Sequence, residues 1–414
     1  MSASLVPIAE RWYRELIGAA VLIGGFGGLL ALVFSGVTVT LIELVFGSPT
    51  SEPFSGSWWW IPIVAVGALV VAFLRARLAV ADEVPGAVAC FKRGWVDPGS
   101  AAQLVLISAV SLVAGASLGP AFGVVVGGGA FGAWIVSHRR DADEGERRMY
   151  ALTGMAGGVG AAFSAPLFGS VLASELSPTP TRHYVTAFIP QYIAATIGYL
   201  IFFGATGAVM LGAFEIPGYV FEWWHLTVSV GLGLLATVLL VAYVLIGKAV
   251  GWVGRRFTDP YVQALILGAL VGAIAFVLPL TANGGSSQLS YETEQAGTLA
   301  AGLLLVVLVA KMFAVHLSLQ AGFLGGTVFP MLFMGGTAGL FVHEVLPGVP
   351  MALAVAGMMA ALPGAIIGAP VSFVLIGVVG VGIGVESLAP IGIAVITAHL
   401  ATGALQVRLD RRDH

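Results

Sequence analysis

Charged residues are scarce in this sequence. Only 9% of its 414 residues are Asp, Glu, Lys or Arg, whereas a soluble domain carries about 25%, because its surface must face water. Eighteen basic and 21 acidic side chains cannot cover a soluble protein of 42.5 kDa. The formal net charge of −3 also offers no basic surface for binding nucleic acid. The composition therefore argues against a soluble enzyme and against a nucleic-acid binder.

Cysteine is almost absent. Cys90 is the single cysteine, so no intrachain disulfide can form and the redox compartment cannot be inferred. A small-residue cleavage site is also missing near the N-terminus, before or after the first apolar run. We therefore expect that run to be a retained helix and not a signal peptide.

Apolar residues are abundant. Hydrophobic residues make up 58% of the chain, the mean hydropathy is +0.99, and apolar stretches follow one another from residue 16 to residue 406. A membrane-spanning helix needs about 20 apolar residues. Several stretches are longer than one upright helix and are interrupted by glycine and proline, which lipid tolerates only where the break is buried in protein or lines a cavity. We predict an all-α polytopic membrane protein with tilted and broken helices.

Basic residues near both ends set the expected orientation. Arg11 and Arg14 precede the first apolar run, and Arg408, Arg411 and Arg412 follow the last one. By the positive-inside rule, both termini are expected in the cytoplasm. We predict a multi-pass protein of the cell membrane, either the plasma membrane or a bacterial inner membrane.

The sequence contains an internal repeat. Three residues of the first half recur 210 positions later, as Pro120 and Pro330, Gly129 and Gly339, and Phe131 and Phe341. The segment GMAGGVGAAFSAPL (154–167) also resembles GMMAALPGAIIGAPV (357–371). Chance similarity in a Gly/Ala-rich sequence is the alternative. We predict four segments: an N-terminal helical segment 1–57, a first membrane repeat 58–215, a second repeat 216–406 and a basic tail 407–414.

Three helix breaks carry the candidate chemistry. They are Ala81 to Pro85, Ala116 to Pro120 and Gly325 to Pro330, and each places proline shortly after small or polar residues. Proline there suits the first turn of a helix. A helix that begins within the membrane has unpaired backbone N–H groups and a positive dipole end. Several such ends together form an anion site without a full positive charge.

At these residues the chain resembles the CLC family of chloride channels and proton–chloride exchangers. The resemblance covers roughly residues 80–400 and rests on the order of several motifs: TGMAGGVGAAFSAPLFGSVLASE (153–175), ANGGSSQL (282–289), Ala310–Lys311, GGTVFPML (325–332) and GMMAALPGAIIGAP (357–370). It implies two membrane repeats inverted relative to each other, a homodimer with one ion pathway per subunit, and transport of chloride.

The chain departs from the family pattern at important positions. Asp82 stands where the family has its chloride-facing serine, and Leu118 stands where it has the gating glutamate. The inward proton-transfer glutamate of the exchangers falls on Leu176, although its neighbour is kept as Glu175. The family's pore tyrosine has no counterpart after Tyr291. Leucine cannot carry a proton, so these departures favour passive flux.

Asp82 has two interpretations that we weigh as equal. An ionised carboxylate beside the pathway would repel chloride, but a buried one could be neutral and donate a hydrogen bond as serine does. It could also mark a different substrate. Alternatively, Asp82 only caps the following helix.

Two weaker patterns occur in the sequence. Gly115–Ala–Ser117–Leu–Gly119 satisfies the G-x-S-x-G nucleophile pattern, with His316 or His399 as a base, but it lies in a membrane stretch where such short motifs recur by chance. Lys311 is either a pore charge or, preferably, a helix-end residue whose side chain extends to the membrane interface.

The expected function is passive transport of a small inorganic anion, most simply chloride. The alternatives are a proton-coupled exchanger that uses Asp82, a carrier of a cation or protonatable solute, and a non-conducting scaffold. No catalysis, cofactor, metal or nucleic acid is expected; the partners are the anion, the lipid bilayer and a second copy of the chain. The predicted ion pathway is formed by Asp82, Ser117, Leu118, Gly119, Gly325, Gly326, Thr327 and Val328.

Overall fold

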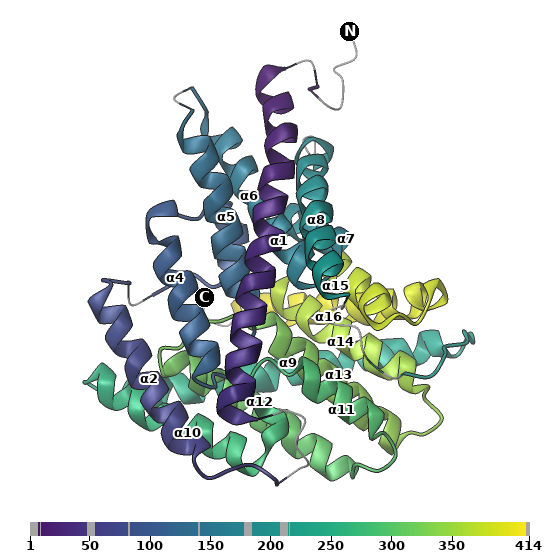
Figure 1. Ribbon diagram of the computed structural model, residues 1–414. Coiled ribbons are helices and arrows are strands. Elements are labelled where there is room, and N and C mark those ends of the chain that lie inside the picture. The colour runs from purple at the N-terminus through teal and green to yellow at the C-terminus, as the bar shows by residue number, and fades with distance from the viewer. Residues whose placement is uncertain are drawn as a thin grey trace.

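The structure is a computed structural model that describes residues 7–410 apart from 9, 48–53, 82, 140, 178–183, 208–213 and 215, and that leaves out the side chains of 406–410. Asp82, a predicted pathway residue, thus lies outside the described residues. The described chain is helical (Figure 1), and its α-helices are α1 Arg11–Phe46, α2 Trp60–Arg77, α3 Ala87–Arg93, α4 Pro98–Val113, α5 Ala121–Ser137, α6 Glu144–Ala162, α7 Pro166–Leu176, α8 Tyr184–Thr206, α9 His225–Gly254, α10 Pro260–Val277, α11 Ser286–Glu294, α12 Ala301–Gln320, α13 Val328–Val345, α14 Met351–Ile367, α15 Pro370–Leu375 and α16 Leu388–Asp410.

Eight of these segments are long and apolar enough to cross a membrane, among the residues that the structure describes. Proline or aspartate at the helix starts explains several boundaries: Asp97 and Asp259 cap α4 and α10, and each is followed by proline in the first turn. The prediction of an all-α polytopic membrane protein is confirmed.

The helices pack in two matching sets, one that runs from α1 to α8 and one that runs from α9 to α16. The pairs α1–α8, α4–α5, α5–α6 and α6–α8 of the first set correspond to α9–α16, α12–α13, α13–α14 and α14–α16 of the second. In Figure 1 α1, α5, α6 and α8 of the first set lie together in the upper part of the view, whereas α2 of the first set packs against α10 of the second at the lower left. The matched packing favours counting α1 with the first half. The segment boundaries at residues 58, 216 and 407 stay predictions.

The two halves correspond with a different offset from the one that the sequence comparison used. Gly119 pairs with Gly326, and α5 and α13 begin two residues after them, at Ala121 and Val328. The spatial offset here is 207 residues, three fewer than the 210 of the residue identities. Three residues are close to one helical turn, so small residues that recur on one helix face allow the alignment to slip by a turn.

Glycine permits the close helix contacts in the core. A Cβ added to Gly154 on α6 would lie only 2.0 Å from the carbonyl oxygen of Gly128 on α5. The two backbones therefore approach at a distance that no other residue permits. Such close approach is how small residues stabilise helix packing in membranes, where dispersion contacts replace the hydrophobic effect.

Candidate functional site

Two broken helices meet at the centre of the molecule. The N–H groups of Gly119 and Gly326 each donate to the other's carbonyl oxygen, both at 2.8 Å. This reciprocal antiparallel contact joins the residues just before α5 and α13. Neither helix start has a side-chain cap. Two positive helix ends therefore face a buried region from opposite halves of the chain.

Leu118 is packed into this junction. Its side chain is 1% exposed, and a Cβ added to Gly325 would lie 2.6 Å from the Leu118 Cβ. Glycine at position 325 is thus needed for the leucine to fit. The contact brings together two predicted pathway residues that are separated by about 200 positions.

A cavity of about 280 Å³ opens on one side of Leu118. We call it the vestibule; it is lined by Thr38, Val39, Ile42 and Glu43 of α1, by Leu112, Leu118, Pro120 and Phe329, and by Asn283 to Gln288 at the start of α11. The α1 residues come from its last turns. If α1 crosses the membrane, the vestibule faces the side opposite the N-terminus.

A second, much smaller cavity lies beyond the junction. We call it the inner cavity; its volume is about 10 Å³, close to the space of one water molecule. All of its lining residues are apolar: Ala87, Val88, Phe91, Ala121, Val125, Val159, Phe163, Leu172, Val328 and Ile367. Ala121 and Val328, the first residues of α5 and α13, line this cavity, whereas Leu118 lines the vestibule. The junction therefore separates the two cavities.

Ser117 holds its own loop in place through two hydrogen bonds. Its hydroxyl donates to the Thr281 carbonyl oxygen at 2.9 Å, and its backbone N–H donates to the Ser318 hydroxyl at 3.0 Å. His316, the proposed partner base, contacts the Tyr243 carbonyl oxygen through Nε2 at 3.0 Å. These two side chains are therefore each engaged with backbone groups and not with each other.

Lys311 does not reach the membrane interface, so the favoured sequence interpretation is wrong. The residue is 0% exposed, and Nζ donates to the carbonyl oxygens of Thr281, Ala282 and Asn283 at 2.9, 3.3 and 2.6 Å. Three backbone acceptors satisfy the ammonium group, which makes the interior tolerable for it. Glu292 is the acidic residue that interacts electrostatically with Lys311, and it is itself buried.

Lys311 and Ser117 together hold the segment that leads into α11. Both donate to the Thr281 carbonyl oxygen. The segment continues to Gly284, where an added Cβ would lie 3.5 Å from Gly119 Cα, and to Gly285, whose φ of +98° favours glycine. This places the start of α11 against the helix junction.

The remaining sequence candidates take different positions. Thr327 is the residue before α13, and its side chain does not cap the helix. Glu175 on α7 accepts from the N–H groups of Val371 and Ser372 at 2.9 and 3.0 Å, and from the Ser372 hydroxyl at 2.6 Å. It therefore caps α15, which belongs to the other half.

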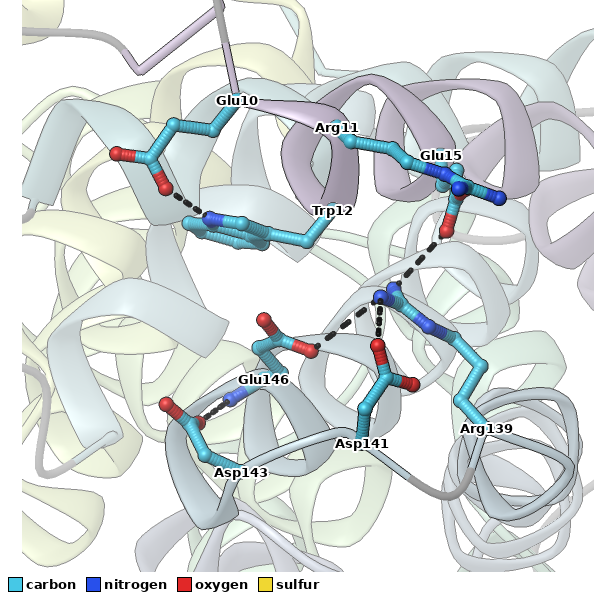
Figure 2. A network of polar contacts seen from close by, with 8 residues as sticks. All are labelled: Glu10, Arg11, Trp12, Glu15, Arg139, Asp141, Asp143 and Glu146. Carbon is cyan, nitrogen blue, oxygen red and sulfur yellow. Dashed lines mark hydrogen bonds and ion pairs between the residues drawn. The ribbon is translucent and has the colours of Figure 1, made fainter.

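A separate polar cavity of about 670 Å³ lies near the start of α1. Figure 2 shows Glu15, Asp141 and Glu146 converging on Arg139, at 3.3, 3.8 and 3.8 Å. Desolvation by burial raises the pKa of Glu146 despite the opposing charge of Arg139. The arginine links α1 to the α5–α6 connection, and we assign this network a structural role.

Sequence reasoning did not place Gln288 or Glu43 in the pathway, although Leu118, a predicted pathway residue, also lines the vestibule. Gln288 is 1% exposed, and its Nε2 has no hydrogen-bond partner among the described residues. Glu43 is the one lining residue with a formal charge. The ANGGSSQL motif pointed to the loop that precedes α11, but only the fold brings α1 beside it.

Comparison with known sequences gives a family. A profile described as "Voltage gated chloride channel" matches residues 63–403. A protein of Ralstonia nicotianae that carries the name "chloride channel protein ClcB-like" is 30% identical over 74% of both chains. An uncharacterised protein of Methanocaldococcus jannaschii is 28% identical over 48% of this chain, a match that spans half of that protein.

Comparison with solved structures supports the same fold. A slow cyanobacterial Cl⁻/H⁺ antiporter superimposes with a TM-score of 0.81 at 18% identity, covering 96% of this chain and 97% of that one. A CLC-type fluoride/proton antiporter gives a TM-score of 0.77 at 17% identity, covering 94% and 95%. At these identities the likeness concerns the fold alone.

Proposed function

The chain belongs to the voltage-gated chloride channel family, and from this premise we propose that it carries a small inorganic anion, most simply chloride, passively across the cell membrane. The observation that carries the proposal is the pairing of Gly119 with Gly326 between the vestibule and the inner cavity. Two uncapped helix N-termini there offer backbone donors to an anion. Neutral donors bind weakly enough for rapid release.

Leu118 supports uncoupled transport. It separates the two cavities and has no group that can bind a proton. The inner cavity has no titratable lining residue either. We propose that Leu118 closes the pathway by excluding water, as apolar constrictions do in other channels.

Proton-coupled exchange is the second candidate. Two solved proteins of similar fold are described as antiporters that exchange chloride or fluoride for protons. In this hypothesis Asp82 supplies the carboxylate that carries the proton. Asp82 precedes α3 in the sequence, and Ala87 and Val88 of α3 line the inner cavity. Glu175 is a weaker candidate, since three donors already occupy its carboxylate.

Purified protein in liposomes distinguishes these functions. The vesicles are loaded in turn with chloride, fluoride, potassium salts and an impermeant anion, while internal pH is recorded. Chloride loss that requires only a valinomycin shunt is the expected result. Proton movement driven by a chloride gradient, and abolished by Asp82→Asn, would establish exchange instead. Cation flux without chloride flux would refute the anion assignment. The absence of flux for every ion tested would indicate a non-conducting scaffold.

We further propose a homodimer with both termini in the cytoplasm. The charge pattern and the family resemblance support this arrangement. Crosslinking in lipid that yields only monomers would contradict the dimer, and protease access to either terminus from the outside would contradict the orientation.

A further inference from the structure

The wall of the vestibule contains an uncapped helix start. α11 begins at Ser286, and no side chain caps this start, because the residue before it is Gly285. The backbone N–H groups of Ser286, Ser287 and Gln288 fall in its first turn, where a helix offers no carbonyl partner. All three residues line the vestibule. The positive end of α11 therefore faces this cavity.

Gln288 adds a second and independent donor. Its side-chain oxygen accepts from the Ser287 hydroxyl at 3.1 Å, whereas Nε2 has no hydrogen-bond partner among the described residues. The residue is 99% buried and lines the vestibule. A buried donor without a partner is costly, so this nitrogen requires an acceptor, and the vestibule that Gln288 lines is the adjacent space that can hold one.

We propose that the vestibule holds a small inorganic anion of halide type, bound by the first-turn N–H groups of α11 and by Nε2 of Gln288. This site is distinct from the α5–α13 junction, because it is built by a third helix. In transport it concentrates the anion beside Leu118, a role that rests on the proposed function. Binding itself does not depend on that function.

Two groups in the same cavity favour the opposite charge. Glu43 lines the vestibule from the last turns of α1, and the buried Asn283 Oδ1 has no donor among the described residues. Glu43 is exposed to solvent, which weakens its field. The donors of α11 and Gln288 lie deeper, so the anion is favoured over a cation. Glu43 then acts as a repulsive group at the rim of the vestibule.

Anomalous diffraction from crystals grown in bromide tests the site without measuring transport. The expected result is a bromine peak at hydrogen-bonding distance from Gln288 Nε2 and the first turn of α11. Gln288→Leu and the longer-chained Gln288→Met should both remove the peak. Gln295→Leu is the matched control, because Gln295 lies at the other end of α11; it should keep the peak. Melting curves identify any variant that fails to fold.

Flux measurements provide the second readout. Gln288→Leu should raise the half-saturating chloride concentration about tenfold, the effect of one hydrogen bond to an ion. Glu43→Gln should lower it roughly twofold to fivefold by removing a partly screened repulsion.

The outcomes separate this inference from the proposed function. No bromine peak in the wild-type protein, or a peak that survives in both Gln288 variants, overturns the site even if chloride flux is observed. A rubidium peak that weakens in Glu43→Gln makes the vestibule a cation site and also overturns the proposal. A bromine peak without any chloride flux supports the site and refutes anion transport.

Discussion

Replacing Leu118 with alanine should increase anion flux. The leucine side chain is 1% exposed and lines the vestibule at the junction beyond which the inner cavity lies, where we propose that it closes the pathway. Passage of an ion requires this side chain to leave its packed position and meet water. Exposing a buried leucine costs about 1.5–3 kcal/mol, or about 0.8 kcal/mol for each CH₂ group. Alanine lacks three of the four side-chain carbons, so opening should become easier by about 2 kcal/mol.

This free energy corresponds to roughly a thirtyfold rise in the open population. The assay is chloride efflux from liposomes with a valinomycin shunt, measured at equal protein density. Leu267→Ala on α10 is the matched control, because Leu267 is also fully buried and lines neither cavity. Both variants create a void and should lose several kcal/mol of stability, but only Leu118→Ala should raise flux.

Unchanged flux in a folded Leu118→Ala protein would refute the reasoning, since the barrier would then lie elsewhere. A rise of the same size in Leu267→Ala would also refute it. That result would attribute the flux to general loosening of the fold.

Other residues give sharper tests of the surrounding structure. Lys311→Met leaves buried carbonyl groups without a donor and should lower the free energy of unfolding by about 2 kcal/mol in denaturant titrations; an unchanged midpoint would contradict its role in holding the loop. Gly119→Ala should abolish chloride flux, because the new Cβ would lie 2.7 Å from a neighbouring aromatic side chain, whereas Gly302→Ala meets nothing within 4 Å and should retain it. Because partial burial raises the pKa of Glu146, the fold favours its protonated form. Thermal stability in detergent should therefore rise as the pH falls toward the ordinary glutamate range, and Glu146→Gln should remove this rise.

The sequence alone determined the class of the protein and its family. Scarce charge and long apolar runs are properties of composition, and they demand a membrane environment whatever the detailed packing. The motifs around Ser117 to Pro120 and Gly325 to Pro330 lie at helix starts, which proline and glycine specify locally. The sequence assigned both motifs to one predicted ion pathway, whereas the pairing of Gly119 with Gly326 is seen only in the fold.

Only the tertiary structure decided which groups face the cavities and which hold the scaffold. The local sequence pattern predicts Lys311 at the membrane interface. It cannot show the three carbonyl groups that bind the lysine, because they come from a segment about 30 residues earlier. Gln288 became a candidate ligand because α1, distant in sequence, closes the vestibule around it. Packing also decides which residues of the two halves correspond. Small residues repeat nearly every helical turn, so the sequence alignment can slip by one turn. Contacts between residues far apart in the chain decide these features, and local sequence patterns carry no information about such contacts.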